Sequence, residues 1–167
     1  MNPNEIRRLI ARSEQLMSDS RTSAEAFLLA FVAWEAFKIR VLLVGRTAMG
    51  ETVAEARKHL DQGQLWRDRA YDEEFASIFG SMPANTRQIG KNYSRMRKLK
   101  NLRNRYVHGH SRTSPARFDE ATRTILTILK SDWEQPIRQA LRKSYGLVHY
   151  TNPLGRLKAN EKPNIAP

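Results

Sequence analysis

The segment from residue 24 to residue 44 limits the possible folds of this chain more than any other stretch. Drawn as a helix, it carries apolar residues on nearly every side, and a helix of that kind must be surrounded by other helices. Four charged residues interrupt it: Glu25, Glu35, Lys38 and Arg40. Three of these charges fall well inside the run, which favours a buried central helix over a membrane span.

Helical spacing of apolar residues recurs along most of the chain, and no stretch alternates convincingly as a strand does. Thr22 and Glu25 have the spacing of a capping box, which predicts the start of the central helix. Ser114 followed by Pro115 predicts another helix start, and Pro136 predicts a break near residues 131–133. The expected helices cover residues 4–18, 22–44, 52–61, 65–80 and 87–108, and residues 114–145 are expected to form two helices separated by that break.

These segments predict an all-α fold, a compact bundle of five or six helices. A chain of 167 residues is typical of one domain with one core. We expect residues 1–145 to form that helical domain. Residues 146–167 contain Pro, Asn and Gly without a sustained period, so we expect an extended or mobile tail.

The charge balance predicts a polyanionic partner. The chain has 29 Lys and Arg against 17 Asp and Glu, a formal net charge of +12. A surplus of this size on a small domain favours a nucleic acid or an anionic membrane as partner, with nucleic acid preferred. The alternative is a basic, soluble surface without a specific partner.

The absence of cysteine removes whole classes of chemistry. With no Cys in the sequence, disulfides, thiolate catalysis and Cys-based zinc sites are excluded. The carboxylates at residues 72–74 are interpreted as acids near a helix start, stabilised by the helix dipole, rather than as metal ligands. With no evident cluster of metal ligands either, we expect no cofactor. The first residues are polar and charged and lack the apolar region of a signal peptide, so we expect a cytoplasmic protein.

The most informative stretch for function is the basic segment from residue 91 to residue 112. It holds eight Lys or Arg and no acidic residue. On the expected helix, Asn104 and His108 lie four residues apart on one face, away from the apolar stripe. Gly109 is placed to end the helix. His108 is therefore expected to face outward rather than into the core.

The sequence leaves the orientation of Arg103 open. Its Cα lies on the flank of the apolar stripe, so its long side chain can reach the polar face or turn inward to Glu35. Glu35 itself shares a face with apolar residues and must be paired, hydrogen-bonded or neutralised there. It is either a structural ion pair or a local gap in burial, or it supports the arginine.

These residue types favour metal-free cleavage of RNA. Histidine exchanges protons near neutral pH, arginine stabilises charge on a phosphate, and asparagine can hold a phosphate oxygen or orient the histidine. The ribose 2′-hydroxyl would attack its own phosphate. Because this reaction uses a base and an acid, and each chain offers one strong candidate histidine, we predict a homodimer with one composite site. Two alternatives stay open: a non-catalytic module that binds RNA or a nucleotide through the same basic face, and a helical adaptor for an acidic protein.

The sequence RNRYVHG at residues 103–109 resembles the Arg-x4–6-His motif of the HEPN superfamily, and the segment with Glu35 resembles the acid-bearing earlier helix of that family. The resemblance covers residues 6–145, and only the motif is specific. It implies a dimeric, metal-independent endoribonuclease of the toxin or antiviral defence type, with an antitoxin protein, nucleotidyltransferase-like or other, as a further partner. Some relatives serve only as binding modules. Carried over by position, Arg103 and His108 would be catalytic, Asn104 would assist and Glu35 would support.

The remaining polar residues of the segment are the candidates for RNA contacts. They are Arg97, Lys100, Asn101, Arg105, His110 and Arg112.

Overall fold

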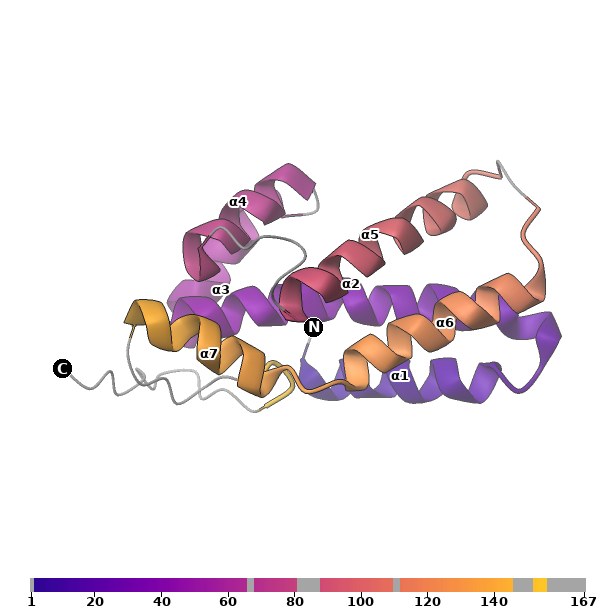
Figure 1. Ribbon diagram of the computed structural model, residues 1–167, viewed down its shortest axis with the longest axis horizontal. Helices are drawn as coiled ribbons and strands as arrows, with labels where there is room; N and C mark the ends of the chain where they lie inside the picture. The colour runs from indigo at the N-terminus through magenta and orange to yellow at the C-terminus, as the bar shows by residue number, and fades with distance from the viewer. Residues whose placement is uncertain (1, 66–67, 81–87, 110–111, 146–151, 156–167) are drawn as a thin grey trace. The chain divides into compact units, whose positions relative to one another are not determined.

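The computed structural model describes residues 2–65, 68–80, 88–109, 112–145 and 152–155, with residues 68, 88 and 142–145 described by their backbone alone. The described residues form seven α-helices and one 3-10 turn and contain no strand (Figure 1). The all-α prediction is confirmed, with seven helices where five or six were expected. The elements are α1 Pro3–Leu16, η1 Ser20–Thr22, α2 Ser23–Ala48, α3 Val53–Gln62, α4 Asp68–Phe79, α5 Gln88–Val107, α6 Pro115–Lys130 and α7 Glu134–Tyr145.

The proline-based predictions of helix boundaries are confirmed. Pro115 is the first residue of α6, and α6 ends at Lys130, four residues before α7 begins. Pro136 lies in the first turn of α7, where its missing N–H breaks no helical hydrogen bond. Ser114 occupies the cap position of α6, but its side chain makes no capping hydrogen bond.

The predicted capping box at Thr22 is wrong. Thr22 ends the 3-10 turn, and its hydroxyl donates to the carbonyl of Leu16 at 2.5 Å. The hydroxyl is therefore used to satisfy a carbonyl at the end of α1. The capping boxes of the described residues stand at the starts of α1 and α3, formed by Asn2 with Glu5 and by Thr52 with Glu55.

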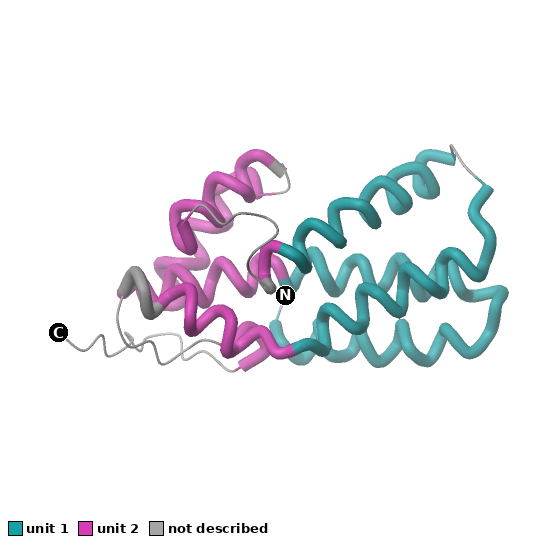
Figure 2. The backbone as a smooth tube through the Cα atoms, viewed as in Figure 1, with its two compact units in different colours: residues 1–37, 91–131 teal, residues 38–90, 132–167 magenta. Residues whose placement is uncertain are grey.

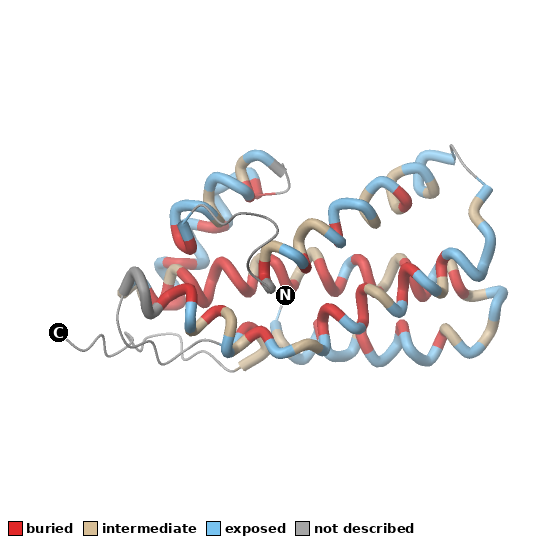
Figure 3. Tube along the Cα trace, viewed as in Figure 1, coloured by how far each residue is buried: buried red, intermediate tan, exposed pale blue. Residues whose placement is uncertain are grey.

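Most residues of α2 are buried, in agreement with its expected central position (Figure 3). One face is less covered: Glu35, Leu28 and Ile39 are half-buried, and Val32 is 45% exposed. No helix in the described part of the chain has the length and hydropathy needed to cross a membrane.

The chain divides into two compact units, each made of two separate stretches of sequence (Figure 2). Unit 1 comprises residues 1–37 and 91–131, and its core is rich in aromatic rings. Phe118 of α6 contacts Phe27 of α2 at 5.4 Å and Tyr106 of α5 at 4.8 Å between ring centroids. Trp34 and Tyr93 join α2 to α5 at 5.1 Å. These contacts hold α5 against the first half of α2.

Unit 2 comprises residues 38–90 and 132–167, and an ion-pair network ties its helices together. Arg46 of α2 donates Nε and Nη2 to the two carboxylate oxygens of Glu74 on α4, at 2.6 and 2.8 Å. Its Nη1 donates to Glu51 at 2.9 Å, and Nη2 lies 2.7 Å from Nε2 of His59 on α3. The carboxylates of Glu74 and Glu51 raise the pKa of Arg46.

A second arginine of unit 2 holds part of the predicted tail. Arg40 is 4% exposed; it donates Nε to the carbonyl of Pro153 at 2.8 Å and Nη2 to the carbonyl of Gly155 at 2.7 Å. Residues 152–155 therefore form a turn anchored on α2. The other residues of the predicted tail lie outside the described part of the chain.

Candidate functional site

The basic helix α5 ends where the sequence predicts. It spans Gln88–Val107, and the backbone N–H of His108 still donates to the carbonyl of Asn104 at 3.0 Å. Gly109 then donates to Tyr106 in a tighter turn, with a φ of +70° that favours glycine. The helix thus stays regular up to His108, and the chain turns at the next residue.

The apolar stripe of α5 faces the core and leaves the polar strip outside. Ile89, Met96 and Leu102 are buried. On the opposite side His108 is exposed, as predicted, and Asn104 is half-buried. The outward position of His108 at the end of a basic helix agrees with a role in binding or chemistry rather than in the core.

Arg103 is half-buried, and its guanidinium is held by two neutral groups. Its Nη1 donates to Oδ1 of Asn104 at 2.9 Å. Its Cζ lies over the ring of Phe31 on α2, 5.8 Å from the centroid, within the range of a cation–π interaction. Within the described part of the chain, no carboxylate contacts this guanidinium. Arg103 therefore reaches the polar strip at Asn104 while its guanidinium carbon lies over an aromatic ring of α2.

Glu35 lies one helical turn after Phe31 on α2, so it is on the same side of that helix as the residue under Arg103. It is half-buried and does not pair with Arg103 among the described contacts. Whether Glu35 supports the arginine stays a prediction.

The candidate RNA contacts follow the outer side of α5 and the turn after it. Arg97, Asn101, Arg105 and Arg112 are exposed, and Lys100 is half-buried. Arg97 and Asn101 lie on the same face as Asn104 and His108, two turns and one turn back. His110 lies outside the described residues. All the described candidates belong to unit 1.

The carboxylates at residues 72–74 do not occupy the first turn of their helix, because α4 begins at Asp68. The dipole interpretation is therefore wrong for them. Glu73 pairs with Arg69 at 2.8 Å, and Glu74 pairs with Arg46. Among the described residues, no group of three or more His, Asp or Glu is arranged to hold a metal ion.

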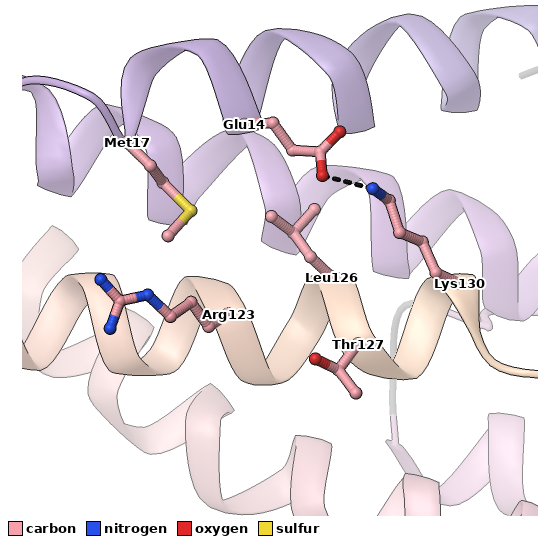
Figure 4. Close-up of a pocket in the computed structure, with 6 residues that line it drawn as sticks. All are labelled: Glu14, Met17, Arg123, Leu126, Thr127 and Lys130. Carbon is pink, nitrogen blue, oxygen red and sulfur yellow. Dashed lines mark hydrogen bonds and ion pairs between the residues drawn. The ribbon is translucent and has the colours of Figure 1, made fainter.

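A separate shallow hollow of about 400 Å³ lies between α1 and α6 (Figure 4). Met17 and Leu126 give it an apolar side, Arg123 and Thr127 line it from α6, and an ion pair between Glu14 and Lys130 closes one end. None of the predicted site residues contributes to it, so the hollow is distinct from the candidate site on α5.

Comparison with known proteins adds no relative. No protein-family model, curated protein or solved structure matches this chain. The case for a function therefore depends on the residues and contacts described above.

The sequence alone did not predict the contact between Phe31 and Arg103. In the sequence, Phe31 is one of many apolar residues of the central helix. Its position four residues before Glu35 was the available signal, since the two share a face of α2. That spacing does not by itself show which residue of α5 lies above the ring.

Proposed function

We propose that this chain is a metal-independent endoribonuclease of the HEPN type. One observation carries the proposal: Arg103, which contacts no carboxylate of the described residues, lies five residues before the exposed His108 at the end of a basic helix. A guanidinium without an acidic partner suits a phosphate, and an exposed imidazole suits proton transfer near neutral pH.

The proposed reaction is transesterification followed by release of the two RNA ends. A base takes the proton of the 2′-hydroxyl, and the 2′-oxygen forms a bond to the adjacent phosphorus. The bond from phosphorus to the 5′-oxygen breaks, and an acid gives that oxygen a proton. The products are a 2′,3′-cyclic phosphate and a 5′-hydroxyl. Arg103 would stabilise the negative charge on the phosphate in the transition state.

We assign the base and the acid to two copies of His108, one from each chain of a homodimer. The histidine on the neighbouring chain supplies the second group that the reaction uses. Val107, beside His108, is an apolar residue that is 51% exposed. Its exposed side chain supports an interface beside the motif.

The test is cleavage of single-stranded RNA by purified protein in EDTA. We expect cleavage to survive chelation, to leave 2′,3′-cyclic phosphate ends and to spare DNA of the same sequence. His108→Ala and Arg103→Ala should each reduce the rate at least about 100-fold. Arg123→Ala is the matched control, because Arg123 is exposed and basic but lies on α6 at the separate hollow.

Two results would redirect the assignment. Unchanged cleavage by both His108→Ala and Arg103→Ala would discard the site. Salt-sensitive RNA binding without any product, and without loss of binding in His108→Ala, would instead favour a phosphate-binding module.

Glu35→Gln tests the supporting role: a fully active variant of unchanged stability would remove Glu35 from the site.

The setting that we propose is a toxin or antiviral defence component in the cytoplasm, with an antitoxin protein as partner. The motif at residues 103–109 supports this setting, because the resemblance implies it. Co-purification of the protein with the product of a neighbouring gene, followed by loss of cleavage in the complex, would be the expected result.

A further inference from the structure

The two contacts of Arg103 restrain different parts of its guanidinium. Cζ of Arg103 lies over the ring of Phe31, 5.8 Å from its centroid, and Phe31 is only 4% exposed. The amide oxygen of Asn104 accepts a hydrogen bond from Nη1 at 2.9 Å. The first contact keeps the guanidinium carbon over the ring, and the second holds one of its two terminal nitrogens.

These contacts leave the Nε–Nη2 edge of Arg103 without a partner among the described residues. Arg46 of the same chain shows what that edge does when an anion is present. Its Nε and Nη2 bind the two oxygens of Glu74 side by side, at 2.6 and 2.8 Å. Two oxygens of a phosphodiester present a similar pair of acceptors.

We propose that Phe31 is a positioning residue that, together with Asn104, holds Arg103 so that its Nε–Nη2 edge binds two oxygens of an RNA phosphodiester. This inference rests on the proposed function and identifies the RNA phosphodiester as the group that Arg103 binds. The ring of Phe31 and the amide of Asn104 are both neutral, so they orient the guanidinium without neutralising its charge. A carboxylate in their place would compete with the phosphate for the same donors.

Phe31→Leu is the direct test, because leucine keeps an apolar side chain and removes the aromatic face. Phe27→Leu is the matched control: Phe27 is a buried ring one turn earlier on α2, and its ring contacts are Phe31 and Phe118. Both substitutions cost core packing. Only Phe31→Leu removes a contact of Arg103. Asn104→Ala, on the helix surface, removes the hydrogen bond that Asn104 accepts from Arg103 without disturbing the core.

Two measurements at a temperature where all variants are folded separate positioning from catalysis. The first is the Nε–Hε resonance of Arg103 in NMR spectra, assigned by its loss in Arg103→Lys. The second is the Kd for a 2′-O-methyl RNA, which lacks the attacking hydroxyl. We expect Phe31→Leu to shift the resonance and weaken binding by about two- to thirty-fold. We expect Phe27→Leu to do neither, and Asn104→Ala to change both measurements in the same direction as Phe31→Leu.

The kcat for cleavable RNA should fall in Phe31→Leu at least as much as the affinity for the 2′-O-methyl RNA. An unshifted Arg103 resonance in Phe31→Leu, or an equal loss of affinity in Phe27→Leu, would overturn the positioning role. If wild-type protein cuts no RNA while the resonance and the Kd change as expected, the nuclease proposal fails and the positioning of Arg103 on a phosphate stands.

Discussion

Three arginines of this chain are held by three different kinds of acceptor, and the difference decides what each can do. Arg46 binds carboxylates, which neutralise it and make it structural. Arg103 rests on a ring and an amide, which leave its charge for a ligand. Arg40 donates to two backbone carbonyls and is almost fully buried, so its charge is costly and serves to hold a turn.

Arg40→Met tests that interpretation at the level of one residue. Burial, and to a smaller extent the charge of Arg57, lowers the pKa of Arg40 to about 10, a cost of about 3 kcal/mol. The variant removes this cost and also removes two hydrogen bonds, so we expect a net change within about 2 kcal/mol. Hydrogen exchange at residues 154 and 155 should become about tenfold faster, because their anchor is lost.

The pH dependence of the same variant has a definite sign. Above about pH 10 the unfolded wild type binds more protons at Arg40 than the folded protein, so the stability of the wild type relative to Arg40→Met should rise with pH there. Below about pH 9 both states hold the proton, and denaturant unfolding should give a constant difference. Arg57→Gln is the control, and it should leave exchange in the turn unchanged. A difference that varies between pH 6 and 8 would contradict the assignment.

At the scale of elements, α2 and α4 approach closely at Gly45. A Cβ built there would lie 2.2 Å from Cγ2 of Ile78 and 3.0 Å from Cζ of Phe79. Gly45→Ala gains about 1 kcal/mol of helix propensity but must displace a buried side chain, so we expect a net loss of about 1–3 kcal/mol by denaturant unfolding. In an Ile78→Ala background the same change should be neutral or stabilising. Equal losses in both backgrounds would show that Ile78 is not the obstacle.

The helix ends show which structural features a sequence can predict. Pro115, Pro136 and Gly109 act on their own backbone within a few residues, so their effects were predicted correctly. Thr22 was misread because its hydroxyl bonds to Leu16, a carbonyl exposed by the end of the preceding helix. The contact between Phe31 and Arg103 joins residues far apart in the chain. Apolar periodicity predicts that Phe31 is buried but not which side chain covers it.

At the scale of the whole molecule, the positive charge is concentrated rather than spread. Eight of the 29 Lys and Arg fall in residues 91–112, where no acid occurs, while the rest of the chain has 21 Lys and Arg against 17 acids. A generally basic surface would not require this separation. This concentration along α5, which His108 follows directly, supports the proposed RNA binding at that helix.

The composite site makes a prediction about mixed dimers. If two copies of His108 act together, a dimer of one wild-type chain and one His108→Ala chain has only one of the two proton-transfer groups. After subunit exchange in an equal mixture, about one quarter of the dimers are fully wild type, so activity should fall to about one quarter of that of wild type alone at the same total protein concentration. Independent sites in each chain would leave about one half.

The control for that experiment breaks the proposed interface itself. Val107→Asp places a charge on the exposed apolar residue beside His108, and a desolvated carboxylate at an interface weakens association. We expect this variant to be folded, monomeric by solution mass and inactive, and to leave the activity of added wild-type protein undiminished. A wild-type protein that is itself monomeric, or a linear fall in activity with the fraction of His108→Ala, would show that one chain carries a complete site.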